Sequence, residues 1–211
     1  MTNAARVWWC VALPTCLSAV PAAAQFRTLP AQPLPRAQRA PIAWFADFGQ
    51  SIGDDGLGRA FAGGVGFRVD SLAIALRGGI WNPRRAGVEA HPAADIVAAY
   101  RVYGGTFRPA NVEALAGAGV TWVDGDWELN LPLGIGVTWR LPTPIVAVGP
   151  WVAGRVHYRT YGSGPAGVDS GVFPGVSAGV SITHHSGPGA RFGLDYLGGE
   201  WGWGIGLHYA R

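Results

Sequence analysis

Charged residues are scarce in this sequence of 211 residues. Only 14% of them are Asp, Glu, Lys or Arg, against roughly 25% in an ordinary soluble domain, while 49% are hydrophobic. All 16 basic residues are arginine, and the formal net charge is only +3. Such a chain has too few charges to coat a water-facing surface. It also has no run of basic residues that would form a nucleic-acid-binding patch.

Cysteines and long apolar runs are scarce as well. Cys10 and Cys16 both lie in the N-terminal apolar segment, so a chain that loses this segment has no thiol for a disulfide or a metal site. No later segment approaches 18 consecutive apolar residues free of Gly and charge, which excludes a membrane-spanning helix. The P-loop, GxGxxG and HExxH motifs are absent, and the histidines show no metal-ligand spacing. We therefore expect no cofactor and no metal.

Residues 1–24 have the three parts of a cleavable secretory signal peptide. Arg6 supplies the positive charge, residues 7–20 the apolar stretch, and residues 21–25, PAAAQ, the A-x-A cleavage region. We expect cleavage after Ala24; the alternatives are an uncleaved anchor and a lipoprotein acylated at Cys16. Residues 25–40 follow as a Pro-rich periplasmic tail, and residues 41–211 form the folded domain.

From residue 41 onward the sequence alternates between two kinds of residue, which predicts β-strands with two unlike faces. Every second residue from Trp127 to Trp139 is bulky and apolar, whereas Glu128 and Thr138 belong to the other set. Ten strands are expected, with eight as the alternative. They lie near residues 42–50, 58–69, 71–81, 94–107, 111–123, 127–140, 145–159, 172–183, 189–198 and 201–210.

The character of the two faces indicates which one meets lipid. The polar face is mostly Gly, Ser, Thr and Ala with single charges, too sparse for a solvated exterior, whereas the apolar face is continuous and bulky. Tight connections at 69–71, 108–111 and 141–143 alternate with longer ones at 50–57, 82–93 and 160–171, as in membrane barrels with short periplasmic turns. The predicted fold is an all-β, closed, antiparallel up-and-down transmembrane β-barrel. A soluble secreted barrel is the alternative.

Residues 202–209, GWGIGLHY, are similar to the closing strand of the small outer-membrane β-barrel superfamily that includes OmpA- and OmpX-type proteins. That family usually ends in an aromatic residue, whereas this chain ends in Arg211 with Tyr209 two positions earlier. The resemblance covers residues 41–211. It implies a monomeric protein of the bacterial outer membrane, with lipopolysaccharide and the barrel-assembly machinery as partners and no nucleic acid.

Charged residues of the predicted polar face are expected to line a narrow lumen. The predicted set is Arg68, Arg77, Asp95, Arg101, Glu113, Glu128, Arg140, Arg155, His157, Arg159, Arg191 and Asp195. A tight turn at 141–143 predicts facing residues whose numbers sum to about 284, which places Glu128 beside Arg155 or His157. Two interpretations stay open: a network that fills and rigidifies the barrel, or a narrow pore that favours anions.

Aromatic residues are expected at the two membrane interfaces. Trp81, Trp122, Trp127, Tyr158, Tyr161 and Trp201 form the predicted outer girdle, and Trp139 and Tyr209 the inner one. The longer loops, 82–93 and 160–171, are the predicted contact surfaces for lipopolysaccharide phosphates or extracellular partners. Their charged residues are Arg84, Arg85, Glu89, His91 and Asp169.

Residues 184–186, His-His-Ser, are the sharpest candidate for catalysis. His184 could act as base and Ser186 as nucleophile, with Asp195 or Glu200 orienting the histidine. The H-x-S pattern resembles that of outer-membrane lipid A deacylases, although Gly187 stands where that family has Asn. The predicted topology puts the stretch at a periplasmic turn, and the alternative interpretation is a flexible polar turn. We therefore predict a structural or surface-interacting barrel and not an enzyme.

Overall fold

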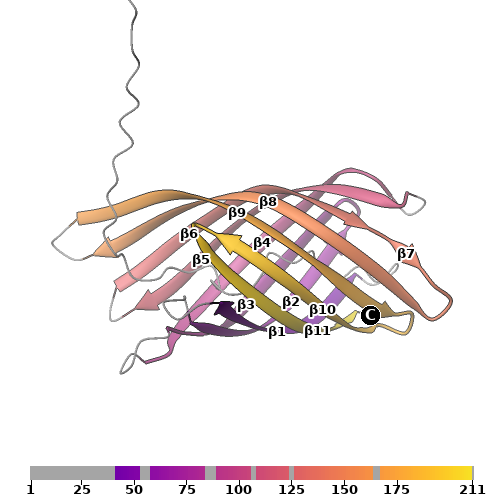
Figure 1. Cartoon of the computed structure of the whole chain (residues 1–211), viewed down its shortest axis with the longest axis horizontal. Helices are drawn as coiled ribbons and strands as arrows, with labels where there is room; N and C mark the ends of the chain where they lie inside the picture. Colours follow the sequence, from indigo (N-terminus) through magenta and orange to yellow (C-terminus); the bar gives the residue numbers. More distant parts are fainter. Residues whose placement is uncertain are drawn as a thin grey trace, which may run out of the picture.

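A computed structural model describes residues 41–52, 58–83, 89–105, 108–123, 126–163 and 167–210. These residues form one antiparallel sheet that closes on itself, because β1 pairs with β11 and β6 pairs with β8. Figure 1 shows the strands running obliquely around a common axis. The predicted all-β, closed, up-and-down barrel is confirmed. Within the described ranges, no helix is long and apolar enough to cross a membrane.

The barrel has ten full strands, so the alternative of eight is wrong. The short β7 continues the line of β6 and pairs with the same neighbour, β8. The bounds are β1 (Ile42–Ile52), β2 (Arg59–Val69), β3 (Leu72–Asn82), β4 (His91–Tyr103), β5 (Ala110–Val123), β6 (Asp126–Trp139), β7 (Leu141–Pro142), β8 (Val146–Ser163), β9 (Gly167–His184), β10 (Pro188–Leu197) and β11 (Glu200–Ala210).

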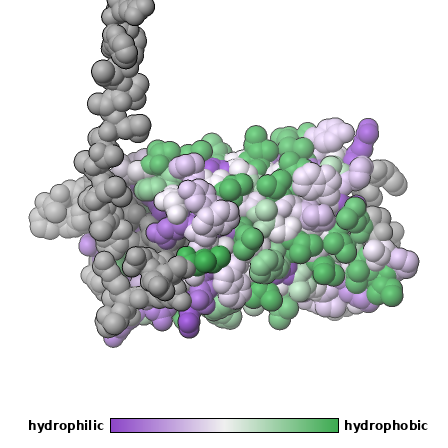
Figure 2. Space-filling model, viewed as in Figure 1, coloured by the Kyte–Doolittle hydropathy of each residue, from purple (hydrophilic) through white to green (hydrophobic). Residues whose placement is uncertain are grey.

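The two faces of the sheet are reversed relative to a soluble protein. Bulky apolar side chains point outward, with Leu133 67% and Leu207 65% exposed, whereas Asn130, His157 and Ser177 are completely buried in the lumen. In Figure 2 the middle of the visible wall is mostly green and pale, and the strongly hydrophilic residues gather mainly toward the two ends. The alternative in which the apolar face forms a core is therefore wrong.

The connection between β6 and β8 differs from the predicted turn at 141–143. The chain reverses at residues 143–146, where the Thr143 amide donates to the Val146 carbonyl at 2.9 Å. Pro142 still pairs with β8, whereas Pro144 has the fixed φ that suits the turn. Glu128 consequently lies opposite Tyr161, and its predicted place beside Arg155 or His157 is wrong.

Residues 160–171, predicted as a loop, belong mostly to the hairpin of β8 and β9, each of 18 residues. In Figure 1 this orange hairpin extends beyond the yellow β10–β11 hairpin at the barrel end away from the C-terminus. The predicted loop 82–93 is also shorter, because β4 begins at His91. Arg84 and Arg85, together with the signal peptide and tail, lie outside the described residues.

Tight turns join several neighbouring strands. Val69 pairs with Leu72 across the predicted turn at 69–71, and Asp70 has a φ of 51°, which Asp tolerates better than most residues. At the opposite end Gly198 and Gly199 connect β10 to β11 with φ values of 60° and 99°. A two-residue hairpin with positive φ at both positions favours glycine in both.

Candidate functional site

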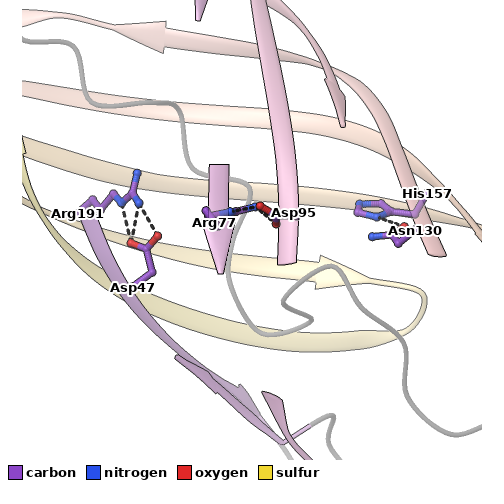
Figure 3. A network of polar contacts seen from close by, with 6 residues as sticks. All are labelled: Asp47, Arg77, Asp95, Asn130, His157 and Arg191. Atoms are coloured by element: carbon purple, nitrogen blue, oxygen red, sulfur yellow. Dashed lines mark hydrogen bonds and ion pairs between the residues drawn. The ribbon is translucent and has the colours of Figure 1, made fainter. Parts of the chain in front are cut away.

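The lumen holds ion pairs that tie strands together from inside. Arg77 on β3 lies opposite Asp95 on β4. Its Nε donates to Oδ1 at 2.7 Å and its Nη2 donates to Oδ2 at 2.6 Å. Two parallel hydrogen bonds between charged groups are the strongest geometry available to such a pair. Figure 3 shows the two side chains reaching toward each other from adjacent strands.

A second pair spans β11. Asp47 on β1 and Arg191 on β10 both face Gly206 in register. The Arg191 Nη2 donates to the two carboxylate oxygens of Asp47 at 2.6 and 2.5 Å. A Cβ on Gly206 would lie 2.0 Å from Asp47 Oδ1, so glycine leaves the space through which the pair meets. The guanidinium also lies 4.9 Å from the centre of the Phe45 ring, a cation–π contact.

Arg155 on β8 uses its three kinds of nitrogen for three different partners. Its Nη2 donates to Asp195 on β10 and its Nη1 donates to Ser177 on β9. Its Nε donates to Nε2 of His157 at 2.6 Å. The Ser177 hydroxyl donates in turn to Asp195 at 2.6 Å. One guanidinium therefore links three neighbouring strands, and all four side chains are buried.

These contacts define the protonation of His157. The Arg155 guanidinium has only donors, so His157 Nε2 accepts and carries no hydrogen. The ring hydrogen is then on Nδ1, which donates to Oδ1 of Asn130 on β6 at 3.1 Å. Figure 3 shows the ring of His157 directed at Asn130. His157 is thus a neutral bridge that extends the Arg155 network to a fourth strand.

The other predicted lumen residues make contacts of different kinds. Arg68 lies 4.0 Å from Glu113, and Arg101 Nη2 donates to the Ser71 hydroxyl at 3.3 Å. The guanidinium of Arg159 lies 4.8 Å from the centre of the Phe173 ring.

Glu128 and Arg159 are both buried. Arg140 is only partly buried and follows the end of β6 at the rim.

Trp81, predicted in the outer girdle, faces the lumen and is only 3% exposed. It stacks on His91 with ring centroids 5.7 Å apart and packs with Ala60, Ala62 and Ala93. The girdle position for Trp81 is therefore wrong. Because Trp81 is near the end of β3 away from the termini, its ring helps to fill that end of the lumen.

One small cavity lies between these side chains. A cavity of about 50 Å³ lies in the lumen, where its lining includes Arg77, Arg155, Arg191, Glu113 and Trp151. A water needs roughly 10–15 Å³ of such volume, so the cavity has room for a few waters.

Six members of the predicted girdle are exposed on the outer wall. They are Trp122, Trp127, Trp139, Tyr158, Trp201 and Tyr209, at 41–51% exposure. The side chain of Tyr161 lies outside the described residues. Three aromatic residues outside the predicted girdle are also exposed, by 55–61%, near the end of the barrel that carries the start of β1 and the end of β11: Trp44, Tyr100 and Tyr103.

Three polar members of the network are not in the predicted lumen set: Asp47, Asn130 and Ser177. Asn130 and Ser177 were on the predicted polar face but carry no charge. Asp47 lies on the same face of β1 as Ala43 and Phe45, which are apolar and face the lumen. Because both faces of β1 carry apolar residues, the sequence shows no clear alternation there. The available signal for Asp47 was its place between the outward-facing Ala46 and Phe48.

Residues 184–186, the predicted catalytic candidate, lie at the turn that follows β9. His184 Nδ1 lies 2.7 Å from the Ser186 hydroxyl, and both side chains are exposed. The predicted orienting groups are not there: Asp195 is bound to Arg155, and Glu200 pairs with Leu197 at the opposite end of the barrel. Within the described residues, no group of three or more His, Cys, Asp or Glu could hold a metal ion.

Comparison with known proteins finds similarity at the level of structure. No protein-family model matches the sequence, and no curated protein matches it. The N-terminal β-barrel domain of Pseudomonas aeruginosa OprF has a TM-score of 0.40 and 15% identity, over 81% of this chain and 97% of that one.

Two further solved structures are similar over comparable lengths. The KdgM porin in complex with disordered oligogalacturonate has a TM-score of 0.40 and 9% identity, over 79% of this chain and 99% of that one. The outer membrane protease OmpT of Escherichia coli has a TM-score of 0.42 and 8% identity, over 82% and 94%. Such distant likeness transfers no activity or substrate to this chain.

Proposed function

We propose that this chain is an integral protein of the bacterial outer membrane, with a side-chain-filled lumen and a structural or surface-interacting role. The observation that carries the proposal is the reversal of the two faces: ion pairs are buried inside and large apolar side chains are exposed outside. In water this wall would expose a very large apolar patch. A closed barrel in lipid satisfies its backbone polar groups within the sheet and gives the apolar wall a matching solvent.

Strand length and the position of the aromatic residues support the same environment. Each full strand has 10 to 18 residues, and a tilted strand needs roughly 9–11 residues to cross a bilayer. Trp44 pairs with Tyr209 near one end of the barrel, and Trp122 pairs with Trp127 near the other. Aromatic residues concentrate at membrane–water interfaces in this way.

The packing of the lumen favours the structural role over a pore. Arg77, Arg155 and Arg191 each bind an aspartate, which neutralises the charge that would attract anions. The cavity that these three arginines line has room for only a few waters. The alternative of a small anion-favouring pore would require these pairs to separate.

A hydrolase is the second alternative, and the hydrogen bond between His184 and Ser186 favours it. A His–Ser pair alone has a base and a nucleophile but lacks the carboxylate that orients the imidazole in a catalytic triad. Release of acyl chains from lipid A by the native chain, and its loss in Ser186→Ala, would support this alternative against the structural role.

The location implies further proposals. A signal peptide at residues 1–24 would bring the chain across the inner membrane, and residues 25–40 would lie in the periplasm. Lipopolysaccharide and the barrel-assembly machinery would then be its natural partners, with the barrel as a monomer.

Two measurements on the protein from outer-membrane fractions test the proposal. Unheated and boiled samples are compared by gel mobility in detergent, and the native protein is added to planar bilayers. We expect a mobility shift on boiling and no discrete conductance steps. A protein found free in the periplasm without a mobility shift would overturn the membrane location. Stable conductance steps, reduced in Arg155→Ala, would replace the structural role by a pore.

A further inference from the structure

The apolar outer wall of the barrel differs in height from one side to the other. On β6, every outward residue from Trp127 to Trp139 is apolar, and these two tryptophans are twelve positions apart. On β11, the outward apolar residues run from Trp201 to Tyr209, eight positions apart. At about 3.4 Å per residue and a tilt of roughly 45°, the two spans are about 29 Å and about 19 Å high across a membrane.

Neighbouring strands share these heights. β5 pairs with β6 at both ends of the taller span. On β2 and β3 the outward apolar residues cover residues 61–69 and 72–80, which are again eight positions each. The strands β3, β2, β1 and β11 lie side by side in the sheet (Figure 1). We call the outward face of these four strands the short wall, and the outward face of β5 and β6 the tall wall.

A row of polar side chains closes the short wall at the end away from the start of β1. Gln50 on β1 lies opposite Arg59 on β2, which lies opposite Asn82 on β3. All three residues alternate with buried neighbours, so their side chains point outward. The row begins directly where the apolar residues of β2 and β3 end. It therefore marks the level at which the short wall stops being suited to hydrocarbon.

We propose that the membrane is locally thinner at the short wall than at the tall wall, so that lipid headgroups reach the row of Gln50, Arg59 and Asn82. The partner that this surface fits is a bilayer with a compressed hydrocarbon layer. The apolar band of membrane barrels is about 25 Å tall; the tall wall exceeds this height, and the short wall falls short of it. The inference rests on the proposed membrane location.

Other arrangements leave the mismatch in place. Tilting the whole barrel raises one wall and lowers the other, but it does not change the height of one wall relative to the other. A bilayer of uniform thickness would hold the polar row in hydrocarbon. Arg59 is long enough to extend its charge toward the interface, whereas Gln50 and Asn82 are too short, and their amides would lose hydrogen bonds to water. A bilayer accommodates a short apolar stretch by thinning, at modest cost.

Spin labels at matched positions on the two walls test the inference. Ile52 lies eight positions from Trp44 on β1, and Leu131 lies eight positions from Trp139 on β6, so each is about 19 Å above its inner aromatic residue. Each residue is replaced by a labelled cysteine in a chain without the two N-terminal cysteines, in vesicles of dioleoylphosphatidylcholine. The measurement is the collision of the label with a water-soluble nickel chelate and with oxygen, which dissolves in hydrocarbon.

We expect the label at Ile52 to collide with the chelate several times more often than the label at Leu131. Labels at Ile42 and Leu141, each two positions beyond the inner aromatic residue of its wall, should meet the chelate equally. Because the vesicles contain a single lipid, a difference between the walls would come from compression of that lipid and not from the sorting of shorter chains.

Removing the polar row separates thinning of the lipid from exposure by a nearby loop. Gln50→Leu with Arg59→Leu lengthens the apolar band, and should lower the chelate contact at Ile52 toward the value at Leu131. Gln50→Asn with Arg59→Gln keeps the row polar and is the matched control, which should leave the contact unchanged. Both variants should keep the gel-mobility shift of the native barrel; if the leucine variant does not fold, Arg59→Leu alone replaces it.

Three results would overturn the inference while the membrane location stands. Equal, low chelate contact at Ile52 and Leu131 would show a bilayer of uniform thickness. High contact at Ile52 together with low contact at Ile42 would show that this side of the barrel is displaced outward. Unchanged contact at Ile52 in the leucine variant would show that a loop exposes the label. High chelate contact at all four labels would instead count against the membrane location itself.

Discussion

Arg155 illustrates how a single side chain can hold several strands of this barrel. It is 6% exposed and bonds with Asp195, Ser177 and His157. Desolvating a guanidinium is costly, and the cost is offset only when the opposite charge and the remaining donors are all satisfied. The lumen meets this condition, because the three nitrogens of Arg155 have acceptors on β10 (Asp195), on β9 (Ser177) and on β8 itself (His157).

Removing the Asp195 carboxylate should therefore lower the free energy of unfolding strongly. Asp195→Ala leaves the buried charge of Arg155 without its partner, and we expect a loss of about 3–5 kcal/mol of unfolding free energy. The measurement is the folded fraction, read from gel mobility, across a denaturant series in lipid vesicles. Asp126→Ala, which removes an exposed carboxylate, is the control and should change stability by less than about 0.5 kcal/mol. Similar losses in the two variants would contradict the role given to the pair.

At the scale of the strand, β6 separates its two environments most clearly. Leu131, Leu133 and Ile135 face outward and are exposed, whereas Glu128 and Asn130 on the other face of the same strand are buried. Because side chains in a strand point alternately to the two faces, a one-residue slip would put these carboxylate and amide groups into lipid. The pattern of side chains therefore fixes the register.

Arginine substitutions along β6 and β7 should show how deep in the membrane each outward-facing position lies. Leu133 lies in the middle of β6, and Leu141 lies beside the turn; they are 67% and 54% exposed. We expect Leu133→Arg to cost about 2–4 kcal/mol and Leu141→Arg about 0–1 kcal/mol in lipid vesicles. The same denaturant series measures both. Equal, small costs would indicate a water-facing wall.

Alternation in the sequence was sufficient to predict the ten strands and the direction of their faces. It was less informative where the lumen accepts apolar side chains, as at Phe45, which covers Gly64. Trp81 shares the parity of the lumen-facing Arg77, but its place near a strand end suggested an interface.

Pairing across the barrel was harder to predict than the strands. The register of β6 and β8 depends on where the chain turns, and Pro142 and Pro144 both fit a turn. The contact between Arg191 and Asp47 joins residues 144 positions apart, and no local pattern specifies such a partner.

At the scale of the whole molecule, the first and last strands meet. The ladder of β1 with β11 runs from Ala43↔Ala210 to Ile52↔Trp201. This junction converts an open sheet into a barrel and removes both edges within the span that the ladder covers.

A disulfide across the junction should report its register. Paired residues in an antiparallel ladder have Cα atoms about 4.5–5.5 Å apart, within the range of a disulfide. With Cys10 and Cys16 replaced by Ser, Trp44→Cys with Tyr209→Cys should crosslink on mild oxidation, and the boiled, unreduced chain should run as a circular species. Trp44→Cys with Ile205→Cys, about 13 Å apart along the strand, should not. A crosslink in the second variant alone would refute the register.

The same junction sets the order of events during folding. Ala43 meets Ala210 only after all the strands between them have been synthesised, and closing a loop of that length costs conformational entropy before any contact compensates it. Proteins dominated by such distant contacts fold slowly. Until the last strand arrives, the first strand presents unpaired backbone groups and an apolar face that invite aggregation. The time between synthesis and closure is thus the period in which this chain is most exposed to aggregation, and we expect protection of β1 during that period to raise the yield of folded barrel.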